Sequence, residues 1–158
     1  MPNWCNNYAT FSHADPAKIK KLVEAAQNNE LFGTFVPLSS GEWDYMTAVN
    51  EWGTKWEASI LDAYQNNDIA EMSFDTAWSP PVAFYDALTK LGFNVDATYL
   101  EEGMCFAGHY TSTEGDYSVE YDFSDEDWRL DVDDEVVVDL LENAYENYLM
   151  WMQEEENE

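Results

Sequence analysis

Apolar and polar residues alternate along six short stretches of the chain, a period that places every second side chain on one face of a β-strand. An Asn66-Asn67 pair predicts a hairpin turn between the second and third stretches. Gly103 and Gly115 mark the turns that separate the last three. The predicted strands are residues 4–12, 53–64, 69–78, 93–100, 104–112 and 117–123.

Three other stretches repeat their apolar residues every three to four positions, which predicts amphipathic helices. The first follows Asp15 as N-cap, the second spans residues 82–90 with Ser79 as N-cap, and the third runs from Asp133 to about Met152. The side chains expected to face inward are Ile19, Leu22, Val23 and Ala26, then Phe84, Leu88 and Leu91, then Val137, Leu140, Leu141, Ala144, Tyr148 and Trp151 or Met152.

The order of these elements is strand, helix, two strands, helix and strand, followed by two more strands and the last helix. It predicts an α+β fold: a ferredoxin-like split βαβ antiparallel sheet with helices on one face, extended by two strands and a long C-terminal acidic helix. Residues 32–52, irregular and rich in aromatic residues, predict a long packed loop. We expect a single domain over residues 1–152 and a frayed acidic tail over residues 153–158.

Charge separates this chain from most domains of its size. The formal net charge is -27, from 33 acidic and 6 basic residues, while 46% of the residues are hydrophobic. The apolar content indicates a folded protein. The charge excludes direct binding to bare nucleic acid or to an anionic membrane, because both would repel the chain. The charge is also uneven, since residues 91–158 hold 21 of the acids and one base, Arg129.

Four short motifs carry a resemblance to a known family: MPNWCNN at the start, WGTKWEA at residues 52–58, FDTAWSPP at residues 74–81 and EEGMCFAG at residues 101–108. Together they resemble the YubB-type ferredoxin-like proteins of bacteriophages and conjugative plasmids, over roughly residues 1–112. The resemblance implies a ferredoxin-like fold and a mobile-element origin, and it brings no catalytic residues. We interpret the tryptophans of these motifs as packing residues. A binding groove lined by Trp43, Trp52 and Trp56 is the alternative.

The sequence offers little for catalysis or cofactor binding, and we expect neither an enzyme nor a cofactor. Its imidazoles are His13 and His109, and neither stands in a recognisable motif. Cys105 and His109 share a strand face, but four residues along a strand separate them by roughly 13 Å. That distance is too long for a nucleophile–base pair. Cys5 and Cys105 are expected to be free thiols in a reducing cytoplasm, since the start lacks the features of a signal peptide.

Metal binding is a weaker alternative. Asp131, Asp133, Glu135 and Glu142 occupy positions one, three, five and twelve of a calcium-loop register. Val136 stands where that loop requires glycine for its sharp turn. The register therefore favours loose cation binding at most, and we expect no dedicated metal site.

The acidic segment after Gly115 predicts an interaction surface. On the last helix, acids spaced by four, three and four residues form a stripe with roughly 5–6 Å between carboxylates, similar to the spacing of phosphates along one strand. Trp128 and Trp151 are expected to anchor the contact. The candidate partner-binding residues are Glu120, Asp122, Asp125, Glu126, Asp127, Trp128, Asp131, Asp133, Asp134, Glu135, Asp139, Glu142 and Glu146.

These features predict a nucleic-acid mimic that binds and inhibits a basic nucleic-acid-binding protein of a host cell, such as a restriction or CRISPR nuclease. The expected partner is that protein, with no nucleic acid and no membrane, and a homodimer is possible. The expected location is the cytoplasm of the host. A non-inhibitory interaction module of a mobile element's replication or packaging machinery is the alternative, and adaptation to high salt is a third explanation of the charge.

Overall fold

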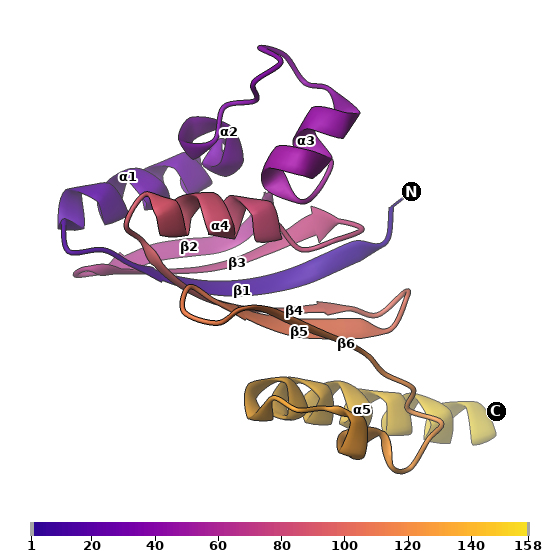
Figure 1. The fold of residues 1–158 in the computed structure, drawn as a ribbon. Coiled ribbons are helices and arrows are strands. Elements are labelled where there is room, and N and C mark those ends of the chain that lie inside the picture. Colours follow the sequence, from indigo (N-terminus) through magenta and orange to yellow (C-terminus); the bar gives the residue numbers. More distant parts are fainter. Residues whose placement is uncertain (1, 158) are drawn as a thin grey trace.

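The computed structural model describes residues 2–157, and within that range an antiparallel sheet of six strands has the order β2-β3-β1-β4-β5-β6 (Figure 1). The first four strands in this order, with helices between them, form the predicted ferredoxin-like arrangement. β5 and β6 extend the sheet beyond β4, which also confirms the prediction. The strands are β1 (Trp4–Ser12), β2 (Ser59–Asn66), β3 (Ile69–Ala77), β4 (Asn94–Glu101), β5 (Phe106–Thr111) and β6 (Gly115–Glu120).

Helices cover the two faces of the sheet unequally. Four helices lie on one face, here called the upper face, and the last helix lies against the other face beneath β4 and β5 (Figure 1). The upper helices are α1 (Pro16–Gln27), α2 (Leu31–Phe35), α3 (Tyr45–Trp52) and α4 (Val82–Lys90). The lower face carries the 3₁₀ turn η1 (Trp128–Asp131) and α5 (Glu135–Glu156).

The main hydrophobic core lies between the sheet and the upper helices. Along β1 the buried and exposed residues alternate as predicted, and Phe11 is fully buried. Phe32 of α2 joins this core, with its ring centroid 4.7 Å from that of Phe84 and 6.2 Å from that of Phe74. The core therefore draws on a segment in which the sequence predicted no helix.

A separate, smaller core lies beneath the sheet. Its buried members are Ala107 of β5, Trp128, Val132, Val137 and Leu141. Burial of each large apolar side chain stabilises the fold by about 1.5–3 kcal/mol. This lower core attaches η1 and α5 to the lower face.

The predicted long loop over residues 32–52 is wrong, because it contains α2 and α3. Asp44 caps α3 by accepting a hydrogen bond from the backbone N–H of Thr47, at 3.0 Å. Gly53 ends the helix with a φ of 92°. Both helices are short, so their apolar residues complete too few turns to establish a period.

Two details around α4 also differ from the prediction. Ser79 does not cap the helix, because its hydroxyl donates to the carbonyl oxygen of Gly53 at 2.6 Å and Pro81 is the N-cap residue. Leu91 does not face inward, since it follows the helix and is 50% exposed. β2 begins at Ser59, six residues later than predicted.

The last helix begins and ends later than predicted. The cap is Asp134, which accepts hydrogen bonds from the backbone N–H groups of Val136 at 2.9 Å and Val137 at 3.1 Å. α5 continues to Glu156, through residues for which we expected fraying. At its far end, Trp151 is half exposed.

Gly108 of β5 lies close to its neighbours on β4 and β6, so the stability of the fold should depend on its lack of a side chain. A Cβ atom added there would lie 2.2 Å from the Tyr99 ring and 2.4 Å from the carbonyl oxygen of Tyr117. Gly108→Ala is therefore expected to lower the free energy of unfolding by about 1–3 kcal/mol. Urea denaturation measures this change.

Gly33→Ala is the matched control, because its Cβ would meet only the Glu57 carboxylate at an ordinary 3.5 Å. This helical substitution is expected to be neutral or to stabilise by up to about 1 kcal/mol. Equal effects of the two substitutions would contradict the packing at Gly108.

Candidate protein-interaction surface

The lower core determines where the acidic side chains point. Val137 and Leu141 are fully buried on the sheet side of α5, so the opposite side of the helix faces solvent. Glu135, Asp139, Glu142 and Glu146 follow that solvent side, and we call them the outer acidic row. The structure thus gathers these four predicted residues on one face of one helix.

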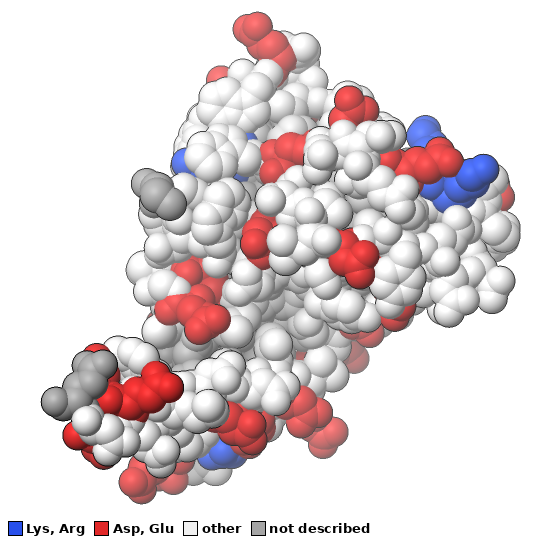
Figure 2. Space-filling view, turned by 180° about the vertical axis from the view of Figure 1, so that it is seen from behind, with Lys and Arg blue, Asp and Glu red and all other residues white. Residues whose placement is uncertain are grey.

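Carboxylates also occur elsewhere on the molecule. Figure 2 shows them along the lower segment that contains α5 and also over the helical layer above it. Most of the Lys and Arg side chains visible in this view gather at the upper right, away from α5. Residues 91–158 contain 21 of the 33 acids and a single base. The charge is therefore concentrated, but not confined, beneath the sheet.

One member of the outer acidic row is already paired. Arg129 donates from Nε and Nη2 to the two carboxylate oxygens of Glu142, the second bond measuring 2.7 Å. Its guanidinium also lies over the rings of Trp128, at 4.4 Å, and Tyr145, at 5.2 Å. The hydrogen bonds from Arg129 hold the pKa of Glu142 below its usual value. Three carboxylates of the row remain available to a partner.

The connection between β6 and α5 carries most of the other predicted residues in ordered turns. Asp122 accepts hydrogen bonds from the backbone N–H of Ser124, at 2.9 Å, and from its hydroxyl, at 2.6 Å. Asp125 accepts from the backbone N–H of Asp127 at 2.9 Å. The exposed acids of this region are Glu120, Asp122, Asp125, Glu126, Asp127, Asp131 and Asp133.

Two predicted partner-binding residues have structural positions instead. The prediction of Trp128 as an exposed anchor is wrong, because Trp128 is 2% exposed in the lower core. Its apolar area is more favourable under the sheet than in water. Asp134 is half-buried, caps α5 and binds His109.

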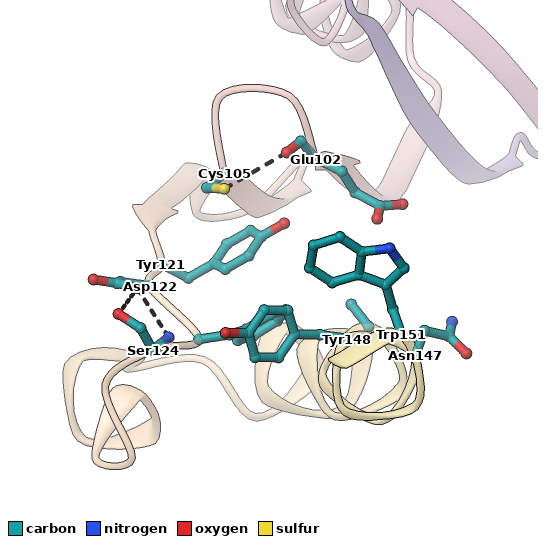
Figure 3. A pocket seen from close by; sticks show the side chains of 10 residues that line it. Glu102, Cys105, Tyr121, Asp122, Ser124, Asn147, Tyr148 and Trp151 are labelled. Carbon is teal, nitrogen blue, oxygen red and sulfur yellow. Dashed lines mark hydrogen bonds between the residues drawn. The ribbon is translucent and has the colours of Figure 1, made fainter. Parts of the chain in front are cut away.

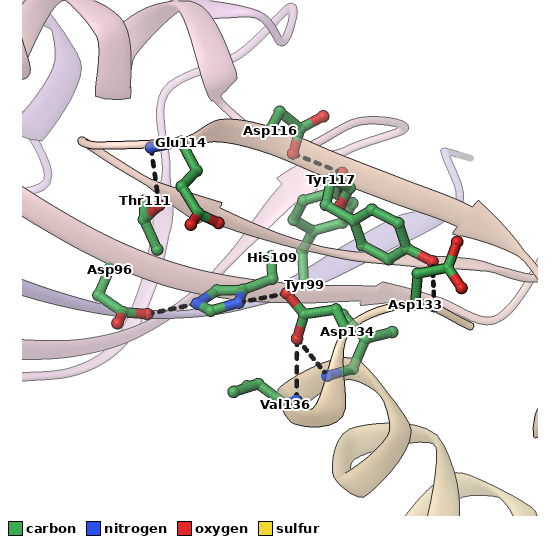
Figure 4. Close-up of polar contacts among 11 residues, drawn as sticks. Asp96, Tyr99, His109, Thr111, Glu114, Asp116, Tyr117, Asp133, Asp134 and Val136 are labelled. Carbon is green, nitrogen blue, oxygen red and sulfur yellow. Dashed lines mark hydrogen bonds and ion pairs between the residues drawn. The ribbon is translucent and has the colours of Figure 1, made fainter.

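His109 joins the sheet to the start of α5 (Figure 4). Its Nε2 lies 2.8 Å from a carboxylate oxygen of Asp96 on β4, and its Nδ1 lies 2.8 Å from one of Asp134. Carboxylates only accept hydrogen bonds, so both contacts are satisfied when both ring nitrogens carry protons. We call these three residues the histidine clasp.

The clasp shifts two pKa values. Burial by itself lowers the pKa of His109, but the hydrogen bonds to Asp134 and Asp96 outweigh it and leave the pKa raised. Burial by itself raises the pKa of Asp134, but the hydrogen bond from His109 and those from Val137 and Val136 leave it lowered. Both shifts favour the charged pair.

A hollow of about 600 Å³ opens between the far half of α5, the β4–β5 turn and the start of the acidic connection (Figure 3). Aromatic rings form much of its wall, and no Lys or Arg is among its lining residues. We call it the aromatic pocket. It is lined by Glu102, Cys105, Tyr121, Asp122, Phe123, Ser124, Ala144, Asn147, Tyr148 and Trp151.

Exposed tryptophans also gather around the start of β1. Trp4 on β1 lies with its ring centroid 6.3 Å from that of Trp56, and both rings are about two-fifths exposed. Trp43 is more exposed, and its indole donates to the carbonyl oxygen of Lys55 at 2.7 Å. Trp52 belongs to the main core instead, where its indole donates to Val36. A groove lined by Trp43, Trp52 and Trp56 together is therefore wrong.

The structure gives no support for metal or disulfide chemistry in the region it describes. Cys5 and Cys105 are free, and burial raises the pKa of the Cys5 thiol to about 12. Between residues 2 and 157, no group of three His, Cys, Asp or Glu residues is placed to hold a metal ion. Within the same range, no helix is both long and apolar enough to cross a membrane.

Sequence reasoning missed the histidine clasp and the aromatic pocket. The clasp depends on cross-strand pairing, which places Thr98 opposite His109 and Asp96 opposite Thr111. Asp96 and His109 are therefore diagonal neighbours on one face. The pocket joins β4–β5 residues to α5 residues about 40 positions later. Only the predicted exposure of Trp151 pointed toward it.

Comparison with known proteins gives a family match. A family model described as a ferredoxin-like domain in Api92-like protein matches residues 51–140, which is more than half of the chain. No curated protein and no solved structure matches significantly. The match includes β2 to β6, the acidic connection and the first part of α5.

The histidine clasp predicts a pH-dependent stability. A raised histidine pKa stabilises the fold below the unfolded value of about 6.5 and loses this effect as the pH rises through the folded value. The lowered pKa of Asp134 stabilises above its unfolded value of about 3.9, and this effect is lost as the pH falls through the folded value. The stability difference between the native chain and His109→Gln should be largest between these limits.

Urea denaturation of both proteins from pH 5 to pH 8.5 measures this difference. We expect it to decrease as the pH rises. In an Asp96→Asn, Asp134→Asn background this decrease should disappear or reverse, because burial alone lowers the pKa of His109 when the imidazolium has no carboxylate partner. A difference that is constant with pH in the native background would contradict the clasp.

Proposed function

The chain belongs to the family of ferredoxin-like domains in Api92-like proteins, and on this scaffold we propose a non-enzymatic nucleic-acid mimic that binds and inhibits a basic, nucleic-acid-binding host protein. The observation that carries the proposal is the outer acidic row, held away from the sheet by the buried Val137 and Leu141. The resemblance of the chain's motifs to YubB-type proteins favours a phage or plasmid origin. A restriction or CRISPR nuclease would then be a suitable target.

Rigidity supports mimicry over a simple solubilising surface. A small domain needs a net charge of only about 2–8 in magnitude for solubility, and this chain has -27. The helix cap at Asp134 and the turn at Asp122 hold the row and the connection in fixed conformations. A fixed row of negative charges suits a cleft that binds a phosphate backbone.

The proposed mechanism is competitive and stoichiometric. Long-range attraction between the acidic face and a basic cleft accelerates association, and salt weakens it. The two imidazoles do not support a catalytic alternative. His109 is engaged by two carboxylates, and His13 accepts a hydrogen bond from the backbone N–H of Asp15 at 2.9 Å.

A second candidate function is a protein-interaction module of a mobile element's own machinery. The exposed Trp4, Trp43 and Trp56 around the start of β1 favour it. An aromatic contact of this kind is much less sensitive to salt than the acidic face.

Charge reversal tests the mimicry. Glu135, Asp139 and Glu146 are replaced by lysine, and Glu142 is kept because it holds Arg129. Each immobilised protein is incubated with host lysate, and the amount of captured DNA-binding protein is measured. The variant should capture about tenfold less than the native chain, because a row of attractive charges becomes repulsive. Competition by duplex DNA and a gel-shift assay of the captured protein establish that the contact lies in its nucleic-acid site.

The control reverses Glu30, Glu42 and Asp68, three exposed acids outside the lower face. It changes the net charge by the same amount and should leave capture largely intact. Equal loss in both variants would mean that total charge, not the row, is responsible. If Trp43→Ala abolishes capture instead, and salt has little effect on capture, the result would favour the second candidate.

A further inference from the structure

The chain's own arginine shows which groups hold a guanidinium on α5. Arg129 lies over the aromatic rings of Trp128 and Tyr145, and Glu142 accepts two of its N–H groups. A guanidinium is planar, so it stacks on aromatic faces and binds a carboxylate through two parallel bonds. Two aromatic rings and one carboxylate are therefore sufficient to hold an arginine side chain at the surface of this helix.

The aromatic pocket repeats this combination nearby. Tyr148 follows Tyr145 by three residues on α5, with 6.3 Å between the ring centroids, and it stands 6.5 Å from Trp151. Tyr121 completes the aromatic wall from the acidic connection (Figure 3). All three side chains line a hollow whose walls contain no basic residue.

Two carboxylates accompany these rings. Glu102 comes from the β4–β5 turn and Asp122 from the acidic connection just after β6, and both line the pocket. Ser124 orients Asp122 through two hydrogen bonds, and these bonds hold the pKa of Asp122 below its usual value. Figure 3 shows the Asp122 carboxylate turned toward Ser124 at the rim of the pocket and the Glu102 carboxylate on the side of Trp151, so the charge around the pocket is negative.

We propose that the aromatic pocket binds an arginine side chain of the basic partner protein, together with an apolar side chain next to it in the partner's sequence. The pocket volume of about 600 Å³ lies within the usual range for ligand sites and exceeds one side chain. A second copy of this chain does not suit the pocket, because both copies carry a net charge of -27. This inference depends on the proposed function for the identity of the partner class.

Short peptides test the pocket directly. The probe is acetyl-Leu-Arg-Leu-amide, and its matched control replaces arginine by citrulline, which keeps the shape of the side chain but removes its charge. Nuclear magnetic resonance follows the indole N–H signal of Trp151, assigned from its loss in Trp151→Phe. We expect saturable shifts with the arginine peptide and about tenfold weaker binding of the citrulline peptide.

Two substitutions locate the binding. Isothermal titration calorimetry measures the variants, because Trp151→Ala lacks the indole signal. Trp151→Ala and Glu102→Gln, both at exposed residues, should each weaken binding of the arginine peptide severalfold, and Trp43→Ala should not. Circular dichroism checks that α5 is retained, and Glu102→Gln tests the pocket if Trp151→Ala shortens the helix. Equal affinity for both peptides, or unchanged affinity in Glu102→Gln with α5 intact, would overturn the proposal.

The outcomes separate this inference from the proposed function. Reversal of Glu135, Asp139 and Glu146 should change peptide affinity less than Glu102→Gln does, because none of the three lines the pocket. If that variant still captures a DNA-binding protein while Trp151 responds to the arginine peptide, mimicry fails and the pocket stands. If the row is required for capture but the peptides bind equally, mimicry stands and the pocket fails.

Discussion

The attachment of α5 and the acidic connection to the underside of the sheet is the interaction on which the rest of this surface depends. Trp128, Val137 and Leu141 provide it, and all three are almost completely buried. At about 1.5–3 kcal/mol for each large apolar side chain, this small core must offset the repulsion among many neighbouring carboxylates. Without it the acids would belong to a flexible tail, with no fixed row and no pocket.

Within residues 91–158, positive charge is sparse and lies at the points where the acidic segment meets the domain. Arg129 connects η1 to the middle of α5 through Glu142, and His109 connects two strands to the start of the same helix. Each base engages aromatic or carboxylate groups whose positions are set by packing. The few cations therefore contribute to the geometry of the lower layer as well as to its charge balance.

The sequence was informative wherever one local rule determined the structure. Alternation predicted β1 with its correct bounds, and Asp15 and Pro16 predicted the start of α1. The order of elements was sufficient for the ferredoxin-like sheet. The solvent face of α5 also followed from spacing alone, because Glu135 and its companions lie opposite the apolar stripe.

Long-range contacts explain most of what the sequence did not reveal. Trp128 stands among acids and reads locally as a surface residue, but the lower face of β5 and β6 needs a large side chain to cover it. Serine is a common helix cap, but the hydroxyl of Ser79 donates its hydrogen bond to the nearby carbonyl oxygen of Gly53. The same limit applies to His109, whose partners come from β4 and from the residue before α5.

In the proposed complex, the aromatic pocket and the acidic row would have different parts. The family match ends at residue 140, within α5, so Tyr148 and Trp151 extend the site beyond the matched region while Glu102 and Tyr121 lie inside it. Exposed carboxylates act over about one Debye length and set the rate of encounter, but water and salt limit the affinity that they supply. Aromatic walls that exclude water slow dissociation, since most differences in affinity between related complexes lie in the dissociation rate. A mimic with the row alone would bind basic clefts rapidly and release them rapidly, and the adjacent pocket is the feature that would distinguish one such cleft from another.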